Sequence, residues 1–143
     1  MSTLDRFQLE VVDTVPAEAL ALIDAGLSAH NAAAAPLEDV QPLGCLARSD
    51  SGEVMGGALG RRWGECCEIQ MLWVHEAHRG RGVGRRLVRA FESAARHRGC
   101  TLCYLETLSF QAPQFYLRLG YEIGLRLAGF PRGIEKFVMT RRL

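Results

Sequence analysis

The sequence predicts an α/β fold in which helices pack on one mixed sheet. Three apolar runs between residues 43 and 74 are separated by turn-forming residues, as in an antiparallel meander. An amphipathic stretch follows at 85–96, with Leu87, Val88 and Phe91 on its apolar side at helical spacing. The next run, 101–105, is apolar on both faces, as a covered central strand would be. A meander, a helix and a buried strand in this order are typical of a layered α/β domain.

The N-terminal quarter of the chain has weaker signals. Residues 6–12 alternate loosely between polar and apolar and could form a first strand. Pro16 suits the first turn of a helix over 17–25. The alanine-rich stretch 32–35 ends at a proline, so it could be a second short helix or a loop. We therefore expect a strand and one or two helices before the meander.

The later elements have clearer boundaries. The apolar runs 43–47 and 54–59 flank the turn sequence at 50–52, which predicts a hairpin. Gly99 follows the last periodic residue of the amphipathic helix and suits a left-handed helix end. The other expected elements are a third meander strand at 65–74, a short helix at 112–119 stopped by Gly120, and closing strands at 121–127 and 134–139.

Bulk composition limits the protein class. The chain has 143 residues, so we expect a single domain over 1–143. Apolar residues make up 48% and charged residues 23%, as in folded proteins, and a net charge of +1 indicates neither a nucleic acid nor a membrane surface as partner. No apolar run could span a bilayer, and the first residues lack a signal-peptide pattern. Five cysteines, an odd number, suit a reducing compartment. We expect a cytoplasmic protein.

A glycine-rich loop, RGRGVG at 79–84, connects the meander to the amphipathic helix. Its three glycines leave backbone N–H groups unshielded by Cβ atoms and permit a tight turn into a helix N-terminus. These N–H groups and the positive end of the helix dipole form a pocket for a phosphate or pyrophosphate. The spacing matches neither the triphosphate-binding P-loop nor the dinucleotide-binding fingerprint. A simple connecting loop with a solvated arginine face is the alternative.

Two motifs resemble those of the GNAT superfamily of acetyl-CoA-dependent N-acetyltransferases. The strand end Leu72-Trp73-Val74 followed by R-x-x-G-x-G from Arg79 is similar to the family's cofactor signature. The segment from Ala112 to Tyr121 is similar to the family's A-x-x-x-Y-x-x-x-G-[FY]. The resemblance spans residues 65–121 and implies a mixed, mostly antiparallel sheet of six to seven strands flanked by about four helices. It also implies acetyl transfer from acetyl-CoA to a primary amine by direct attack in a ternary complex.

The resemblance assigns the cofactor-binding residues. It places the pyrophosphate on the loop amides and pantetheine along the strand end, with the Leu72 N–H pointing at the thioester carbonyl to stabilise an oxyanion. Tyr116 matches the tyrosine that protonates the leaving thiolate, although it could simply pack beside Phe115. Ser109 stands where many members have Asn, which alters that contact with the coenzyme. The implied cofactor residues are Leu72, Trp73, Val74, Arg79, Gly80, Arg81, Gly82, Val83, Gly84, Arg85, Ser109 and Tyr116.

Glu68 is the candidate general base, because some family members carry a carboxylate eleven residues before the loop arginine. Period-two alternation would place Glu68, Gln70 and Leu72 on one face of the strand. Glu65 and Glu106 are rival carboxylates. The acceptor, a small-molecule or peptide amine, stays open among small amines, amino acids, antibiotics and protein lysines. The candidate acceptor-binding residues are Asn31, Gln70 and Glu106.

The sequence leaves two other functions and several partners to consider. A non-catalytic acyl-CoA-binding regulatory module on the same fold would keep the loop but not depend on Tyr116. A nucleic-acid binder using the basic stretch 79–98 would need interleaved aromatics, and that stretch has only Phe91, so no nucleic-acid partner is expected. The C-x-x-C at 100–103 has no second Cys or His pair at ligand spacing, so no metal is expected. The closing strands, 121–139, are candidate homodimer elements.

Overall fold

A computed structural model describes residues 6–143, which fall in two compact units, one ending at Leu37 and the other spanning Glu38–Leu143. The first five residues, part of the stretch examined for a signal peptide, lie outside this description. The expected single domain over 1–143 stays a prediction. From residue 6 onward, no helix is both long enough and apolar enough to cross a membrane.

The first unit contains one helix, α1 (Ala17–Ala34). It begins directly after Pro16 and continues through the alanine-rich stretch, because alanine is the strongest helix former and only Pro36 stops the run. The alternative of a second short helix at 32–35 is therefore wrong. The expected strand at 6–12 is also wrong: these residues have no regular structure, because alternation alone does not supply a partner for ladder hydrogen bonds.

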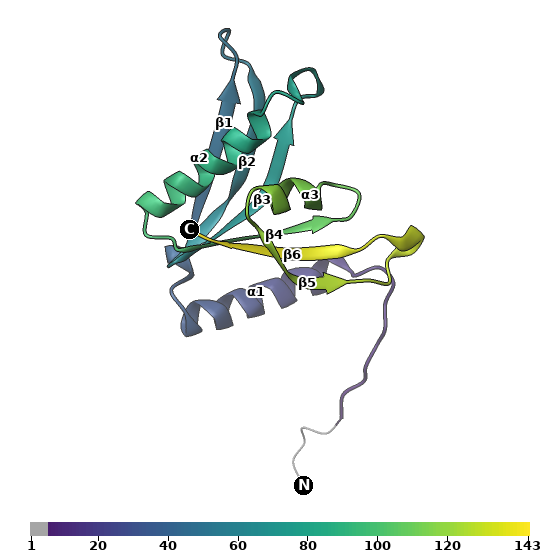
Figure 1. Cartoon of the computed structure of the whole chain (residues 1–143). Helices are drawn as coiled ribbons and strands as arrows, with labels where there is room; N and C mark the ends of the chain where they lie inside the picture. Colours follow the sequence, from purple (N-terminus) through teal and green to yellow (C-terminus); the bar gives the residue numbers. More distant parts are fainter. Residues whose placement is uncertain (1–5) are drawn as a thin grey trace. The chain divides into compact units, whose positions relative to one another are not determined.

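The second unit contains one sheet of six strands in the order β1-β2-β3-β4-β6-β5 (Figure 1). All neighbouring strands are antiparallel except β3 and β4, which are parallel and joined by the crossover helix α2 (Val83–His97). A short helix, α3 (Pro113–Arg118), follows β4. The strands are β1 (Gln41–Arg48), β2 (Val54–Trp63), β3 (Cys66–Val74), β4 (Leu102–Leu108), β5 (Glu122–Leu127) and β6 (Lys136–Arg142).

This architecture confirms the predicted fold class, a mixed and mostly antiparallel α/β sheet. The described residues contain three α-helices rather than about four, since the N-terminal helix is continuous. The predicted hairpin is present, with Gly52 at a positive φ of 88° in its turn. Gly99 likewise ends α2 at φ 91°. Short 3₁₀ turns lie at Leu37–Asp39, Glu76–His78 and Pro131–Gly133.

β3 and β4 are paired over only part of their length. Their partners run from Cys66–Leu102 to Ile69–Leu105 and stop there. Beyond that point β3 stays with β2 while β4 stays with β6, and the two strands diverge (Figure 1). The edge of β3 from Gln70 to Val74 that faces β4 therefore has no strand partner among the described residues. Its free N–H and C=O groups can bind an extended ligand.

A β-bulge at Gln70 lies at the point of divergence. The pairing of β2 with β3 passes from Gly60–Ile69 to Leu59–Met71, so Gln70 is the extra residue. A bulge interrupts the alternation of faces. Ile69 before it and Leu72 after it consequently pack in the same core, while Glu68 lies on the opposite face. The prediction that Glu68, Gln70 and Leu72 share one face is therefore wrong.

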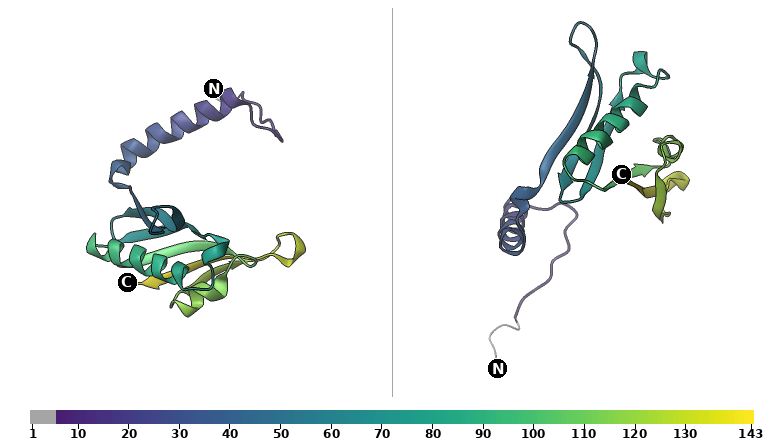
Figure 2. Two further views of the ribbon diagram at one scale, coloured as in Figure 1. Left: turned by 90° about the horizontal axis from the view of Figure 1, so that it is seen from above. Right: turned by 60° about the vertical axis from the view of Figure 1, so that its left-hand side comes forward.

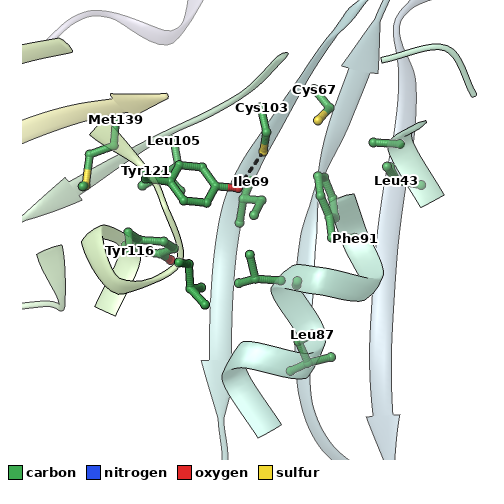
Figure 3. Packing of buried hydrophobic residues seen from close by; sticks show 14 of the residues in the cluster. Leu43, Cys67, Ile69, Leu87, Phe91, Cys103, Leu105, Tyr116, Tyr121 and Met139 are labelled. Atoms are coloured by element: carbon green, nitrogen blue, oxygen red, sulfur yellow. Dashed lines mark hydrogen bonds between the residues drawn. The ribbon is translucent and has the colours of Figure 1, made fainter. Parts of the chain in front are cut away.

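The core lies between α2 and the inner face of the sheet (Figures 2 and 3). Val88 and Phe91 of α2 are fully buried, as the amphipathic pattern predicts. The same helix also buries Glu92, which is held by ion pairs with Arg89 and Arg141. Arg89 Nη2 donates a 3.0 Å hydrogen bond to the carbonyl oxygen of Leu119. This network ties α2 to the C-terminal end of α3.

Candidate active site

The N-terminus of α2 forms a cradle of backbone amides. Gly80 and Gly82 have positive φ angles of 74° and 77°, and a Cβ at either position would meet no atom within 4 Å. The amide of Arg86 makes the first bond of the helix, 3.1 Å to the carbonyl oxygen of Gly82. The amides of residues 82–85 therefore have no acceptor within the helix, and Gly82 provides no side-chain cap. This geometry fits an anionic phosphate group.

A cavity of about 400 Å³ lies at this helix end. Arg85 and Arg118 line it, so cationic side chains surround the free amides. The Arg79 Nε donates a 2.9 Å hydrogen bond to the carbonyl oxygen of Val74, which joins the loop to the end of β3. Arg81 does not line this cavity. The side chain of Arg79 therefore has a structural role at the mouth of the cradle, whichever ligand binds there.

A second cavity, of about 430 Å³, lies beside the unpaired edge of β3. Leu72 and Trp73 of β3 form one wall, and Phe115 and Tyr116 of α3 form another. Phe115 also lines the phosphate-side cavity, so the two spaces share its ring as a wall. A Cβ at Gly84 would lie 3.5 Å from that ring, which shows how closely α2 approaches α3. The free strand edge and the amide cradle therefore open into adjacent spaces.

Tyr116 is 8% exposed and lines the second cavity. Figure 3 shows it among the buried core residues, close to Tyr121. Its ring makes edge-to-face contacts with Phe115 and Tyr121, at centroid distances of 5.1 and 5.7 Å. Its hydroxyl has no hydrogen-bond partner among the described residues. Burial, together with the nearby Cys103 thiol, raises the pKa of Tyr116 to about 12. The phenol is therefore protonated at neutral pH and free to donate to a ligand.

A third cavity, of about 300 Å³, contains the candidate base Glu68. Glu68 Oε2 accepts hydrogen bonds from Arg61 Nε at 3.1 Å and from the Tyr104 hydroxyl at 3.0 Å. The Glu68 side chain is 16% exposed, and its Oε1 has no partner in the part of the chain described. Burial and the hydrogen bond to Glu68 raise the pKa of Tyr104. Two donors on one oxygen thus orient the carboxylate and leave the other oxygen free.

The second and third cavities adjoin at the point where β3 and β4 diverge. Glu68 lies on the outer face of the sheet, whereas Tyr116 belongs to the core on the inner face. Tyr116 as an acid and Glu68 as a base can therefore reach the space between the diverging strands β3 and β4 from opposite faces of the sheet. The residues that line both cavities are Ile69, Gln70, Glu106, Thr107 and Gln111.

The other predicted site residues fall in different places. Gln70 and Glu106 line the Glu68 cavity, and the rival base Glu65 does not. Ser109 Oγ accepts a 3.0 Å hydrogen bond from the Glu135 amide, and Ser109 lines none of these cavities. Asn31 lies in α1 of the other unit, so its assignment to the acceptor stays a prediction.

Several residues that line the cavities were not predicted from the sequence, among them Phe115, Arg118, Gln111 and Lys136. Phe115 and Arg118 lie within one turn of Tyr116 on α3, so helical spacing around that tyrosine was an available signal. Gln111 and Lys136 carried no signal, because only the pairing of β4 with β6 brings their segments together. Within residues 6–143, no group of three or more His, Cys, Asp or Glu side chains could hold a metal ion.

A sheet that opens beside an amide cradle suits an extended, phosphate-bearing ligand. The chain belongs to the acetyltransferase (GNAT) family, whose model matches residues 14–121. It is 35% identical over 111 residues to the blasticidin-S acetyltransferase of Streptomyces morookaense, covering 77% of this chain and 79% of that one. An acetyltransferase of Agrobacterium fabrum is 35% identical over 109 residues, covering 76% of this chain and 80% of that one. An acetyltransferase from Bacillus cereus superposes with a TM-score of 0.78 at 26% identity, over 94% of this chain and 98% of that chain. The chain is accordingly an acyltransferase.

Proposed function

We propose that this protein transfers the acetyl group of acetyl-CoA to a primary amine by direct attack in a ternary complex. The observation that carries the proposal is the continuity of the site. The amide cradle of α2, the unpaired edge of β3 and the Tyr116 hydroxyl border two cavities with a common wall. This arrangement suits a ligand with a pyrophosphate at one end, an extended amide-bearing arm in the middle and a thioester at the other end.

Backbone groups of the protein make most of the contacts that hold acetyl-CoA. The free amides of residues 82–85 hold the pyrophosphate, with Arg85 and Arg118 adding positive charge. The pantetheine arm pairs with β3 at 72–74 as an added strand, because that edge lacks a protein partner. At the far end, the Leu72 amide donates to the thioester carbonyl and stabilises the oxyanion of the tetrahedral intermediate.

The chemistry divides between the two faces of the sheet. Glu68, directly or through a water molecule, removes a proton from the ammonium form of the acceptor. The free amine then attacks the thioester carbonyl carbon, forming the C–N bond and an oxyanion. As the intermediate collapses the C–S bond breaks, and Tyr116 gives its proton to the departing sulfur. The nitrogen that has attacked loses its second proton to solvent, and the Tyr116 phenolate takes up a proton from solvent, which restores the phenol. The products are the N-acetylated amine and free coenzyme A.

Similarity to a named relative supports the class of acceptor more strongly than the geometry of the cavity does. The relative named for blasticidin S supports a small amine-bearing molecule, such as an antibiotic, over a protein lysine. The cavity of about 300 Å³ next to Glu68 is of a size for part of such a molecule.

Calorimetric titration with acetyl-CoA tests the proposal, with wild type compared to Gly82→Glu. The glutamate places a negative charge where the proposed phosphate would lie. We therefore expect Gly82→Glu to abolish acetyl-CoA binding. Gly82→Ala is the matched control, because open space surrounds the Cβ position and only the positive φ opposes it. Failure of folded wild-type protein to bind acetyl-CoA overturns the proposal. Binding without thiol release for any amine would favour the non-catalytic acyl-CoA-binding module.

A further inference from the structure

The Glu68 cavity, which we call the acceptor cavity, is lined by two chemically different sets of side chains. Its lining residues come from β3, β4, β6 and the loop before α3. Glu68 and Glu106 provide carboxylates. Lys136 provides an ammonium group, and Gln111 provides an amide. A cavity lined by both positive and negative groups is complementary to a ligand that carries both charges, more than to a ligand that carries only a positive charge.

The carboxylates of Glu68 and Glu106 are suited to bind an ammonium group. Glu68 Oε1 is free because both donors to this side chain bind Oε2. The Glu106 side chain is 58% exposed and only weakly paired, at 3.9 Å from Lys136 Nζ. An exposed ion pair at this distance contributes little, so a ligand ammonium can compete for Glu106.

Gln111 contributes a hydrogen-bond donor to the same cavity. Gln111 Oε1 accepts a 2.9 Å hydrogen bond from the Leu108 amide and lies 3.5 Å from the Thr107 hydroxyl. Because a backbone N–H can only donate, the oxygen of this side chain must face Leu108. The Gln111 NH₂ group is therefore turned away from the loop, and it has no hydrogen-bond partner among the described residues.

Lys136 adds a second hydrogen-bond donor to this cavity. It lies on β6 directly across from Leu108, the residue that anchors Gln111. Its ammonium has Glu106 and the Phe130 ring as neighbours, the latter 5.8 Å from Nζ to the ring centroid, and its side chain is 35% exposed. An ammonium and a free amide NH₂ that line one cavity can together bind a carboxylate.

We infer that the amine acceptor also carries a carboxylate, held by Lys136 Nζ and Gln111 Nε2 while the ammonium faces Glu68 and Glu106. This inference rests on the proposed function and names its substrate class, a small zwitterionic amino acid. The carboxylate anchor fixes the molecule at one end and orients its amine toward the divergence of β3 and β4.

A panel of matched acceptors tests the inference. The twenty common L-amino acids, β-alanine and γ-aminobutyrate are each compared with their primary amides, at saturating acetyl-CoA, by thiol release and mass of the product. Each amide keeps the amine and removes only the carboxylate charge. We expect kcat/KM to be about tenfold or more higher for the acids that react than for their amides, since charged hydrogen bonds supply discrimination of that order.

Three variants assign the preference to residues. Lys136→Met removes the ammonium and should erase the acid-over-amide preference through KM, with unchanged affinity for acetyl-CoA. Gln111→Glu keeps an oxygen for Leu108 but puts an anionic oxygen in place of the donor, so it should reject the acids more strongly than Gln111→Met does. Arg142→Met, an exposed charge removal on the same strand, is the control and should change neither.

The outcomes separate the two levels of inference. Equal or better turnover of the amides overturns the zwitterionic assignment, as does acetyl-CoA binding without turnover of any amino acid in the panel. An acid preference that survives Lys136→Met and both Gln111 variants also overturns it. Failure to bind acetyl-CoA is a different result, because it overturns the proposed transferase function itself.

Discussion

Gly60 on β2 lies so close to the backbone carbonyl of Glu68 on β3 that a Cβ at Gly60 would overlap that carbonyl. The contact lies beside the bulge at Gln70, where β3 changes the face it presents to the core. A missing side chain on one strand therefore permits the backbone irregularity on its neighbour. That irregularity puts Leu72 on the same face as Ile69, opposite to Glu68.

Gly60→Ala should destabilise the protein severely, by about 3 kcal/mol or more, because the obstructing atom belongs to the backbone and cannot rotate away. Urea unfolding followed by circular dichroism measures the loss. Gly44→Ala on the neighbouring strand is the control, since the nearest atom there is the flexible Leu59 Cδ2 at 2.9 Å. Equal stability of Gly60→Ala and wild type would contradict this account of the bulge.

Tyr116→Phe should lower kcat by about 100-fold or more while the affinity for acetyl-CoA stays the same. The substitution removes only a hydroxyl that has no hydrogen-bond partner among the described residues, so folding should be little affected. Stopped-flow or steady-state thiol release measures the rate. Tyr121→Phe is the matched control: its hydroxyl bonds Cys103 in the core at 3.1 Å, so stability should fall without a comparable loss of rate.

Glu68→Gln should reduce kcat/KM by about 100-fold, because an amide cannot accept the proton of the acceptor. The amide can still bond Arg61 and Tyr104, so the local structure should persist. Rates from pH 6 to 9 provide the measurement. Glu65→Gln is the control outside the cavity, and Glu106→Gln tests the rival base inside it. A larger loss for Glu106→Gln would transfer the role to that residue.

Alkaline pH should destabilise the protein partly through Tyr116. Its folded-state pKa is raised to about 12, whereas an unfolded tyrosine titrates near pH 10. Below pH 10 both states keep the proton, and the contribution of Tyr116 to stability is fully present. As pH rises from 10 to 12 the unfolded state ionises first, so the free energy of unfolding falls. Urea midpoints at pH 8, 10 and 11 should therefore decrease less for Tyr116→Phe than for wild type.

Local chemistry made several parts of this protein predictable. The positive φ angles at Gly80 and Gly82, the amphipathic face of α2 and its end at Gly99 each depend on residues close together in the chain. The order of elements from the hairpin to the closing strands is confirmed for the same reason. Where local signals were weak, at 6–12 and 32–35, the prediction was wrong.

The layout of the candidate site depends on contacts between distant segments. Glu68 and Tyr104 are brought together by the β3–β4 pairing, and Gln111 and Lys136 by the β4–β6 pairing. The sequence by itself determined the glycine-rich turn into α2, the helix that bears Tyr116 and the family. Only the tertiary structure decided that the strands diverge after Ile69, that β3 has a bulge at Gln70, and that Gln111 and Lys136 line one cavity with Glu68 and Glu106. Strand register and bulges are set by the packing of neighbouring strands, which no single segment of sequence contains.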